Sequence, residues 1–200
     1  MITAIILAAG QSKRMGQPKM LLPWGETTVL GQVIETIQRV GVDQIMVITG
    51  GAREKVEKLV IQHGLRVVHN EDYESSGMIS SLQCGIRILR DSVGDEHRLS
   101  EAALICLGDQ PQIREGIACA VVNRFIETGA SLVMPSYRMQ RGHPWLVSSM
   151  HWDEILQMKK TKTPRDFLSL HASEIDYISV DDPSVITDLD TFEDYLKSRP

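Results

Sequence analysis

Residues 7–19 read Leu7-Ala8-Ala9-Gly10-Gln11-Ser12-Lys13-Arg14-Met15-Gly16-Gln17-Pro18-Lys19, directly after the apolar run at 4–7. The run predicts a buried strand, and the small residues after it let the backbone approach a ligand with its N–H groups directed at phosphate oxygens. Arg14 adds a planar fork for two oxygens, and Lys19 adds a mobile point charge. The stretch therefore predicts a nucleoside triphosphate site at the end of the first strand.

Two better-known glycine loops do not fit this stretch. A Walker A loop needs Lys-Ser or Lys-Thr directly after its second glycine, but Gly16 is followed by Gln17 and Pro18. The dinucleotide fingerprint fails because Ser12 stands where its second glycine belongs. The alternative is a strand-to-helix turn whose cations are incidental.

The composition is that of an ordinary α/β protein. The chain has 200 residues, of which 42% are hydrophobic, 24% charged and 5% aromatic, so we expect residues 1–200 to form a single domain with a sizeable core. A net charge of -5 argues against a broad basic face for nucleic acid. An anionic ligand should instead meet a local cluster such as Arg14 and Lys19.

Cysteine usage and hydropathy indicate the cellular compartment in which we expect the protein. Cys84, Cys106 and Cys119 form no C-x-x-C pair and leave an odd count, which fits a reducing environment, and Cys106 falls in an apolar run where packing explains it. The N-terminus begins at once with an apolar strand, without a basic leader, and no apolar stretch approaches the roughly 18 residues of a membrane span. We expect a cytoplasmic protein that binds neither membranes nor nucleic acid.

Short apolar runs alternate with amphipathic helical segments. This order predicts an α/β fold with a mostly parallel central sheet and helices on both faces. We expect residues 91–101 to be a solvated surface connection. The predicted strands are 4–7, 44–49, 65–68, 102–107, 131–134 and 176–180, and the helical faces are Leu30, Val33, Ile34 and Ile37, then Val56, Leu59 and Val60, then Leu82, Ile86 and Leu89, then Ile117, Val121, Val122 and Phe125.

Such sheets bind ligands beyond the carboxyl ends of their strands. Asp109 follows the fourth run, where a carboxylate can hold a hard cation such as Mg²⁺ while the cation contacts phosphates. The alternative is a turn aspartate that caps a helix near Ile113, although Pro111 makes that spacing awkward. Metal binding is the favoured interpretation.

The C-terminal segment offers a second carboxylate. We expect Asp190 or Thr191 to cap the final helix, with Glu193 and Asp194 in its first turn. Asp188 precedes the cap and is either a second metal ligand or an ordinary loop carboxylate.

Two further loops are chemically ambiguous. Ser80 or Ser81 could read a base or ribose, but a helix cap is the favoured interpretation from the residues alone. His143, between Gly142 and Pro144, either contacts the phosphate of a second substrate or is a rigid loop element. No paired nucleophile and base is visible, which suits a phosphate monoester attacker that is already anionic at neutral pH.

These motifs together resemble the molybdenum-cofactor nucleotidyltransferases, within the Rossmann-like nucleotide-diphospho-sugar transferase fold. The resemblance covers nearly the whole chain. It is carried by the stretch at 7–19, by Gly77-Met78 with Ser80-Ser81-Leu82, by Gly108-Asp109-Gln110-Pro111, by Gly142-His143-Pro144, and by Asp188-Leu189-Asp190-Thr191 with Glu193-Asp194-Tyr195.

The resemblance implies roles for individual residues. Asp109 and Asp188 would hold Mg²⁺, and Ser81 would lie near the base and ribose. His143 and Arg165 would meet the second substrate, although relatives have a glycine-rich segment where this chain has Lys160-Thr161-Lys162-Thr163-Pro164. Arg14, Lys19 and Asp109 would be catalytic, and the nucleotide-binding set would be Leu7, Ala8, Ala9, Gly10, Arg14, Lys19, Ser81 and Asp109.

The resemblance also implies a reaction. Relatives that use GTP typically have Leu-Ala-Gly-Gly and Asp-Lys where this chain has Ala9 and Pro18, which favours CTP. We expect CTP:molybdopterin cytidylyl transfer that releases pyrophosphate, with transient contact to a molybdenum hydroxylase or its chaperone. The alternatives are a sugar-phosphate or alditol-phosphate acceptor, and a non-catalytic maturation chaperone that holds the molybdenum cofactor.

Overall fold

A computed structural model describes residues 1–12, 15–75, 77–91 and 100–200. Each of the six apolar runs forms a strand, with ends that differ by at most three residues from those predicted. The strands are β1 (Ile2–Ala8), β2 (Pro23–Trp24), β3 (Thr27–Thr28), β4 (Gln44–Thr49), β5 (Arg66–His69), β6 (Ala102–Leu107), β7 (Leu132–Tyr137), β8 (Gln140–Arg141), β9 (Trp145–Ser148) and β10 (Ile175–Ser179).

The predicted helical faces all lie in helices. The helices are α1 (Val29–Arg39), α2 (Arg53–Gln62), α3 (Gly77–Asp91), α4 (Glu115–Thr128), α5 (Trp152–Gln157), α6 (Pro164–Leu170) and α7 (Phe192–Ser198), with short 3-10 turns η2 (Lys19–Leu21), η4 (Ser149–His151) and η5 (Pro183–Ile186). Most of the surface connection predicted at 91–101 falls outside the described residues.

The main sheet has the strand order β10-β7-β9-β6-β1-β4-β5, with β8 paired to β7. Its pairs are parallel except those made by β9 and β8, so the sheet is mostly parallel as predicted. Strand β9 was not predicted, because its four residues directly after Gly-His-Pro are too few to separate from a loop. It runs antiparallel between β6 and β7.

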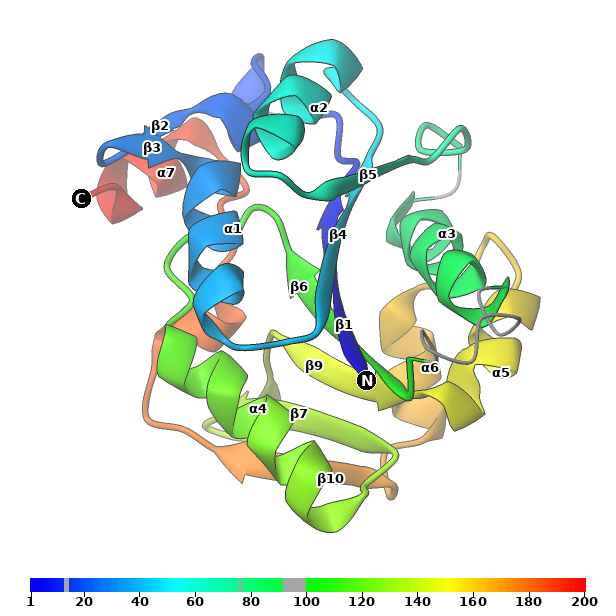
Figure 1. Cartoon of the computed structure of the whole chain (residues 1–200). Coiled ribbons are helices and arrows are strands. Elements are labelled where there is room, and N and C mark those ends of the chain that lie inside the picture. The colour runs from blue at the N-terminus through cyan, green and yellow to red at the C-terminus, as the bar shows by residue number, and fades with distance from the viewer. Residues whose placement is uncertain (13–14, 76, 92–99) are drawn as a thin grey trace.

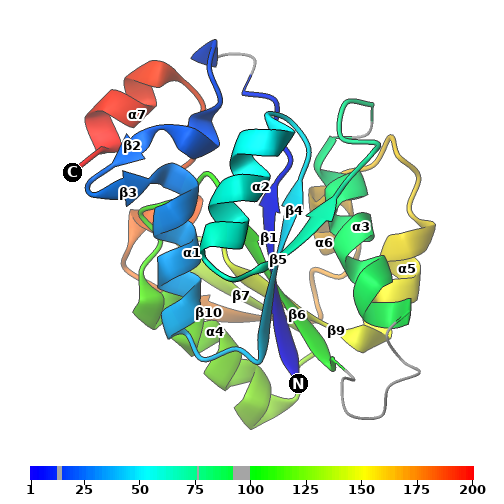
Figure 2. The ribbon, with the colours of Figure 1, turned by 45° about the horizontal axis from the view of Figure 1, so that its top comes forward.

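Helices cover both faces of this sheet (Figures 1 and 2). Alternation along β1 sends Ala4 and Ile6 toward the face covered by α1, α2 and α4. Ile5 and Leu7 point to the other face, which α3, α5 and α6 cover. β1 lies between β4 and β6, so it is buried along its whole length, and this central position fixes where its carboxyl end delivers the chain.

Helix α7 packs away from the main sheet, on the hairpin β2–β3 (Figure 1). The hydroxyl of Tyr195 donates a hydrogen bond to the carbonyl of Pro23 at 2.6 Å, and the ring contacts Trp24. The C-terminal segment is thereby held beside the chain that follows the first strand. Residues 188–190 lie just before this anchored helix.

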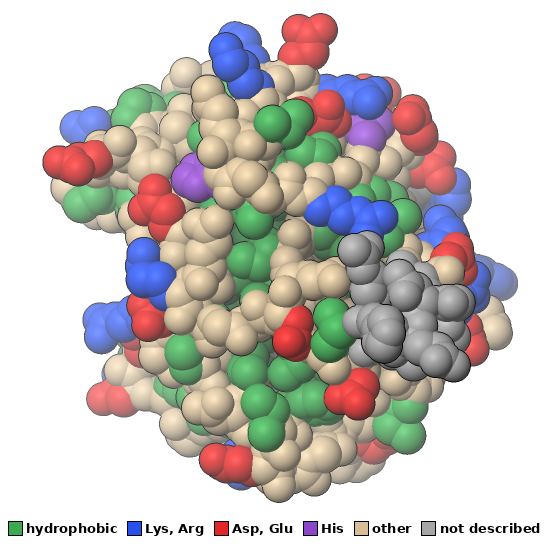
Figure 3. Space-filling model, in the orientation of Figure 1, with side chains coloured by type: hydrophobic (Ala, Val, Ile, Leu, Met, Phe, Trp, Pro, Cys, Tyr) green, Lys and Arg blue, Asp and Glu red, His purple; other side chains and the backbone are tan. Residues whose placement is uncertain are grey.

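On the face seen in Figure 3, lysine and arginine side chains are interspersed with aspartate and glutamate rather than gathered in one field. No helix in the described ranges is long and apolar enough to cross a membrane. Cys84, Cys106 and Cys119 are all free, and Cys106 is buried.

Candidate functional site

A cleft of about 440 Å³ lies at the carboxyl ends of β1 and β6, the edge at which the sequence places the ligand. Six of the predicted nucleotide-binding residues line it, together with Tyr73, Met78 and Asp190, which were not in the predicted binding set. The full lining is Leu7, Ala9, Gly10, Gln11, Ser12, Met15, Lys19, Met20, Tyr73, Gly77, Met78, Ser81, Leu107, Asp109 and Asp190.

Two predicted nucleotide-binding residues are not part of this lining. Ala8 is fully buried and packs in the core beneath α1, so its side chain faces away from the cleft. Arg14 lies outside the described residues. The other members of the predicted set meet around one cavity.

Hydrogen bonds within the loop after β1, and one from Gly51 directly after β4, fix the conformation of this loop. Ser12 has a positive φ of 52°, its Oγ accepts a hydrogen bond from the backbone N–H of Lys19 at 3.0 Å, and its carbonyl accepts one from Met15 at 2.9 Å. The N–H of Gly51 donates to the carbonyl of Ala9 at 3.3 Å. These bonds fold the loop back so that Lys19 returns to the end of β1.

Glycines after β4 allow that close approach. A Cβ at Gly50 would lie 2.8 Å from the carbonyl oxygen of Ala9 and 2.6 Å from Cβ of Tyr73, and one at Gly51 would lie 3.0 Å from the carbonyl oxygen of Gly10. Only glycine fits there without displacing the loop. The Gly-Gly pair directly after a predicted strand was the available signal, and the sequence reasoning missed it.

Lys19 and Asp109 form an ion pair across the cleft. The Nζ of Lys19 donates to Oδ2 of Asp109 and, at 3.1 Å, to the carbonyl of Leu189. The two side chains are only 12% and 19% exposed, so the charges are largely withdrawn from solvent. The alternative role of Asp109 as a helix cap is wrong, because α4 begins at Glu115 with Arg114 at its N-cap.

Asp188 lies beside this pair. Its Oδ1 accepts a hydrogen bond of 2.7 Å from Nε2 of Gln110. Burial raises the pKa of Asp188, the negative charges of Asp109 and Asp190 raise it further, and the Gln110 hydrogen bond and Lys19 oppose them. The structure therefore gathers three carboxylates around one lysine, a set of hard oxygen donors.

The final helix confirms one of the two predicted caps. Thr191 caps α7, and Asp194 completes the capping box. Asp190 instead lines the cleft. The prediction that Ser80 or Ser81 caps a helix is wrong, because α3 already begins at Gly77.

The two serines have a different partner. Nδ2 of the buried Asn70 donates to Oγ of Ser80 at 2.8 Å and to Oγ of Ser81 at 3.0 Å. Of the two, only Ser81 also lines the cleft. Asn70 therefore fixes the orientation of a hydroxyl at the site, although nothing in the sequence singles it out.

His143 and Arg165 differ in their surroundings. His143 is not among the described residues that line the cleft. Its backbone N–H donates to the carbonyl of Val185 at 2.8 Å. Burial lowers the pKa of His143 to about 4, against the opposing effects of Asp109 and a hydrogen bond with the Ile105 backbone, so the ring is neutral at pH 7. Arg165 is exposed, in the first turn of α6, and its charge acts on His143.

The sequence pattern of the MobA-like NTP transferase domain matches residues 4–175, which include the loop after β1, Ser81 and Asp109. The chain belongs to this family. The matched segment includes the loop after β1, Lys19 and Asp109, which meet at the cleft. The chain is a member of a nucleotidyltransferase family and is classed as an enzyme on that basis.

Two full-length relatives illustrate the range of the family. The chain is 28% identical over 201 residues to the molybdenum cofactor cytidylyltransferase of Escherichia coli K12, covering 99% of this chain and 95% of that protein. It is 29% identical over 203 residues to the nicotine blue oxidoreductase of Paenarthrobacter nicotinovorans, covering 96% and 93%.

Solved structures show the same fold. Rv0371c of Mycobacterium tuberculosis H37Rv is 28% identical with a TM-score of 0.79, covering 98% of this chain and 95% of that one. A nucleotidyl transferase from Methanothermobacter has a TM-score of 0.80 at 22% identity, covering 100% and 96%. The fold of this chain is therefore the Rossmann-like nucleotidyltransferase fold.

Proposed function

We propose that this chain transfers the cytidylyl group of CTP to the terminal phosphate of the molybdenum cofactor, molybdopterin, and releases pyrophosphate in a Mg²⁺-dependent reaction. The observation that carries the proposal is the ion pair of Lys19 and Asp109 at the mouth of the phosphate loop, with Asp188 beside it. The full-length similarity to a cytidylyltransferase supports the choice of nucleotide and acceptor.

The residues at the site fit a hard divalent cation. Asp109 and Asp188 would hold Mg²⁺ through oxygen, and Lys19 now supplies the positive charge at that place. When bound, the cation neutralises phosphate charge and orients the oxygens of the nucleotide. A structure of Rv0371c, 26% identical over 98% of this chain with a TM-score of 0.73, is of a complex with manganese, which supports a divalent ion here.

The protein's own groups act by position and charge. We propose that Gly10 and its neighbours receive the triphosphate, that Ser81 meets the ribose or base, and that Lys19 stabilises the charge that grows on the departing pyrophosphate. Arg14 would assist Lys19. No protein base is required, because a phosphate monoester with a second pKa of roughly 6 is already anionic at pH 7.

The second substrate would be bound by residues other than those that bind the nucleotide. Arg165 is exposed in the first turn of α6 and can meet an incoming phosphate, whereas the buried, neutral His143 lies deeper, next to Asp109. We propose that Arg165 binds the acceptor phosphate and that His143 supports the carboxylate of Asp109. Contact with a molybdenum hydroxylase or its chaperone, and a cytoplasmic location, stay predictions.

The test is pyrophosphate release from CTP, with the nucleotide product identified by mass spectrometry. Parallel reactions contain Mg²⁺ with molybdenum cofactor, with a sugar phosphate, with an alditol phosphate, or with no acceptor. We expect cytidylylated cofactor only in the first. Product with a sugar or alditol phosphate alone would reassign the acceptor, and cofactor binding without pyrophosphate release would identify a chaperone and overturn the catalytic proposal.

A further inference from the structure

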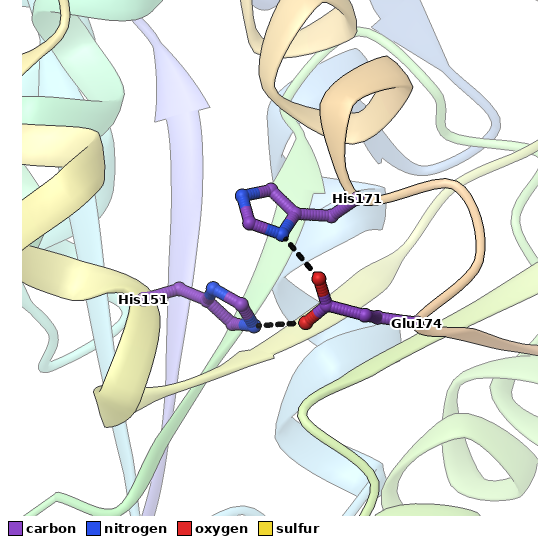
Figure 4. A group of neighbouring side chains, drawn as sticks. All are labelled: His151, His171 and Glu174. Carbon is purple, nitrogen blue, oxygen red and sulfur yellow. Dashed lines mark hydrogen bonds and ion pairs between the residues drawn. The ribbon is translucent and has the colours of Figure 1, made fainter.

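A second group of chemically active side chains lies away from the nucleotide cleft. His151 ends η4, His171 caps the C-terminus of α6, and Glu174 immediately precedes β10. Each offers one ligand atom, and these atoms lie within 4.8 Å of one another. Figure 4 shows the two rings and the carboxylate converging, with His151 and His171 each joined to a different oxygen of Glu174.

This cluster is on the opposite edge of the sheet from the nucleotide cleft. Strand β9 is antiparallel to β6, and its last residue, Ser148, pairs with Ala102, the first residue of β6, so the turn that carries His151 follows at the amino edge. Strand β10 starts beside Leu132, the first residue of β7, and Glu174 therefore lies at the same edge. The cluster is not explained by nucleotide binding.

Nε2 of His151 is a buried nitrogen that has no hydrogen-bond partner among the described residues. His151 itself is 6% exposed. The closest carboxylate oxygen, Oε2 of Glu174, lies 3.6 Å away, beyond hydrogen-bonding distance. Burial and, secondarily, His171 lower the pKa of His151, against the opposing charges of Glu174 and Glu154.

His171 is oriented by two carboxylates. Its Nδ1 lies 2.7 Å from Oε1 of Glu174, and its Nε2 lies 2.9 Å and 3.0 Å from the two oxygens of Glu154. At these distances both ring nitrogens donate N–H groups to carboxylates, Nε2 to Glu154 and Nδ1 to Glu174. A metal ion between Nδ1 and Glu174 would take the place of the Nδ1 proton, while Nε2–H continues to donate to Glu154. Histidines that bind metals are commonly held by a carboxylate in this way.

We propose that His151, His171 and Glu174 bind one Zn²⁺ ion, with Glu154 as the outer carboxylate that orients His171. Tetrahedral zinc with bonds of about 2.0–2.2 Å separates neighbouring ligand atoms by roughly 3.4 Å. Nδ1 of His171 lies 2.7 Å from one oxygen of Glu174, Nε2 of His151 lies 3.6 Å from the other, and one ligand atom from each residue lies within 4.8 Å of the other two, so the side chains would rotate to meet one ion. Two imidazoles and one carboxylate favour zinc over magnesium, and water would complete the coordination.

The ion would join three separate segments. Phe167 of α6 packs against the rings of both histidines, so the site is backed by apolar surface. Zinc there would tie η4 to the end of α6 and the start of β10. Because the ligand atoms come together only in the folded chain, zinc would raise the melting temperature, and the rise would grow with the zinc concentration relative to the Kd.

The experiment measures zinc binding by the tag-free protein after treatment with a chelator. Zinc is titrated in competition with a chromophoric chelator, with millimolar Mg²⁺ present to occupy the carboxylates of the nucleotide cleft. Co²⁺ replaces zinc in a parallel sample, where visible absorption reports tetrahedral coordination. We expect one equivalent of bound zinc, and a melting temperature that zinc raises.

Variants locate the site. Glu174→Gln and His171→Gln should bind zinc about 100-fold more weakly or worse, and Glu154→Gln about 10-fold to 100-fold more weakly. Glu174 is half-exposed, so its variant reports on binding even if the histidine variant does not fold. His63→Gln, which removes a histidine elsewhere, and Asp109→Asn, in the nucleotide cleft, should bind zinc as the unaltered chain does. Unchanged zinc affinity in Glu174→Gln, or its loss in Asp109→Asn, would overturn the proposal.

Discussion

The ammonium of Lys19 donates a hydrogen bond to the carboxylate of Asp109, ninety residues further along the chain. The same ammonium reaches the carbonyl of Leu189, which lies in the chain between Asp188 and Asp190. Lys19 is thus the internal counter-ion of this site. If Asp109 holds a divalent cation as proposed, that cation would compete with Lys19 for the carboxylate, and the displaced lysine would be free to meet phosphate.

The first prediction is that Lys19→Met lowers kcat for pyrophosphate release about 100-fold, with a smaller effect on the KM for CTP. The reason is that charge on the leaving group grows toward the transition state, where one such contact typically contributes on the order of 3 kcal/mol. Steady-state kinetics at saturating Mg²⁺ separate the two constants. A change confined to KM would reduce Lys19 to ground-state binding.

The same variant tests the exchange between lysine and metal. Without Lys19, Asp109 keeps its negative charge with no internal counter-ion, so Mn²⁺, used as a spectroscopic probe, should bind the nucleotide-free protein more tightly than it binds the unaltered chain. Lys197→Met is the matched control, because Lys197 forms only an exposed ion pair with Glu193. Weaker Mn²⁺ binding in Lys19→Met would show that lysine does not compete for that site.

The second prediction is that Asp109→Asn lowers turnover at least about 100-fold while the protein stays folded. An amide cannot supply the negative charge that a hard cation requires. Asp188→Asn should lose less, because its remaining oxygen can still accept the hydrogen bond from Gln110. Asp153→Asn, on the surface of α5, serves as the control. Pyrophosphate release by Asp109→Asn at the unaltered rate in saturating Mg²⁺ would remove Asp109 from the metal site.

The third prediction concerns Asn70, which is not part of the cleft lining and is expected to act through Ser81. Asn70→Ala should raise the KM for CTP about 5-fold to 10-fold, the equivalent of one lost hydrogen bond, and change kcat less than 2-fold. Ser81→Ala should behave alike. Ser80→Ala loses the same type of bond outside the cleft. An equal rise in the KM for CTP of Ser80→Ala would mean that helix α3 had shifted, rather than that the Ser81 hydroxyl alone had lost its orientation.

The fourth prediction is that Gly50→Ala destabilises the fold by about 1–3 kcal/mol and weakens nucleotide binding. The added methyl group would meet the backbone of Ala9 and Cβ of Tyr73, neither of which can swing aside. Gly116→Ala is the matched control, since a Cβ there meets nothing within 4 Å and alanine suits a helix, so it should be neutral or stabilising. Chemical denaturation and CTP titration give both quantities, and equal stabilities for the two variants would refute the contact.

The sequence predicted what depends on local pattern. Strand β1 is apolar at every position except Thr3, because helices cover both faces of the sheet around it. Its end, and the loop with Lys19, could therefore be placed from the sequence alone. Strand β9 could not, because four residues carry too little periodicity to be told from a loop.

Tertiary partners explain the other omissions. Asn70 contacts Ser81 across a loop, and the approach of Gly50 to Ala9 depends on how β4 pairs with β1. His151, His171 and Glu174 are spread over a segment that gives no metal-ligand spacing, and only the packing of α6 on the turn before α5 brings them together. Such contacts leave no periodic signal in the sequence.

The last prediction is that the chain prefers CTP to GTP and that Ala9→Gly weakens the preference. Ala9 is 7% exposed and lines the cleft, so its methyl group limits the space for a purine. One methyl group typically changes discrimination 10-fold to 200-fold, and we expect the ratio of kcat/KM for CTP over GTP to fall about 10-fold in the variant.

The matched control for Ala9→Gly is Ala8→Gly, which removes a methyl group from the core beneath α1 and should change stability but not the nucleotide ratio. The ratio is measured with molybdenum cofactor as the acceptor, so that the nucleotide is the only variable. A ratio at or below one in the unaltered chain would overturn the assignment to cytidylyl transfer and leave the nucleotidyltransferase family intact. A ratio above one that Ala9→Gly does not alter would instead place the discrimination elsewhere in the cleft, whose lining also includes Tyr73 and Met78.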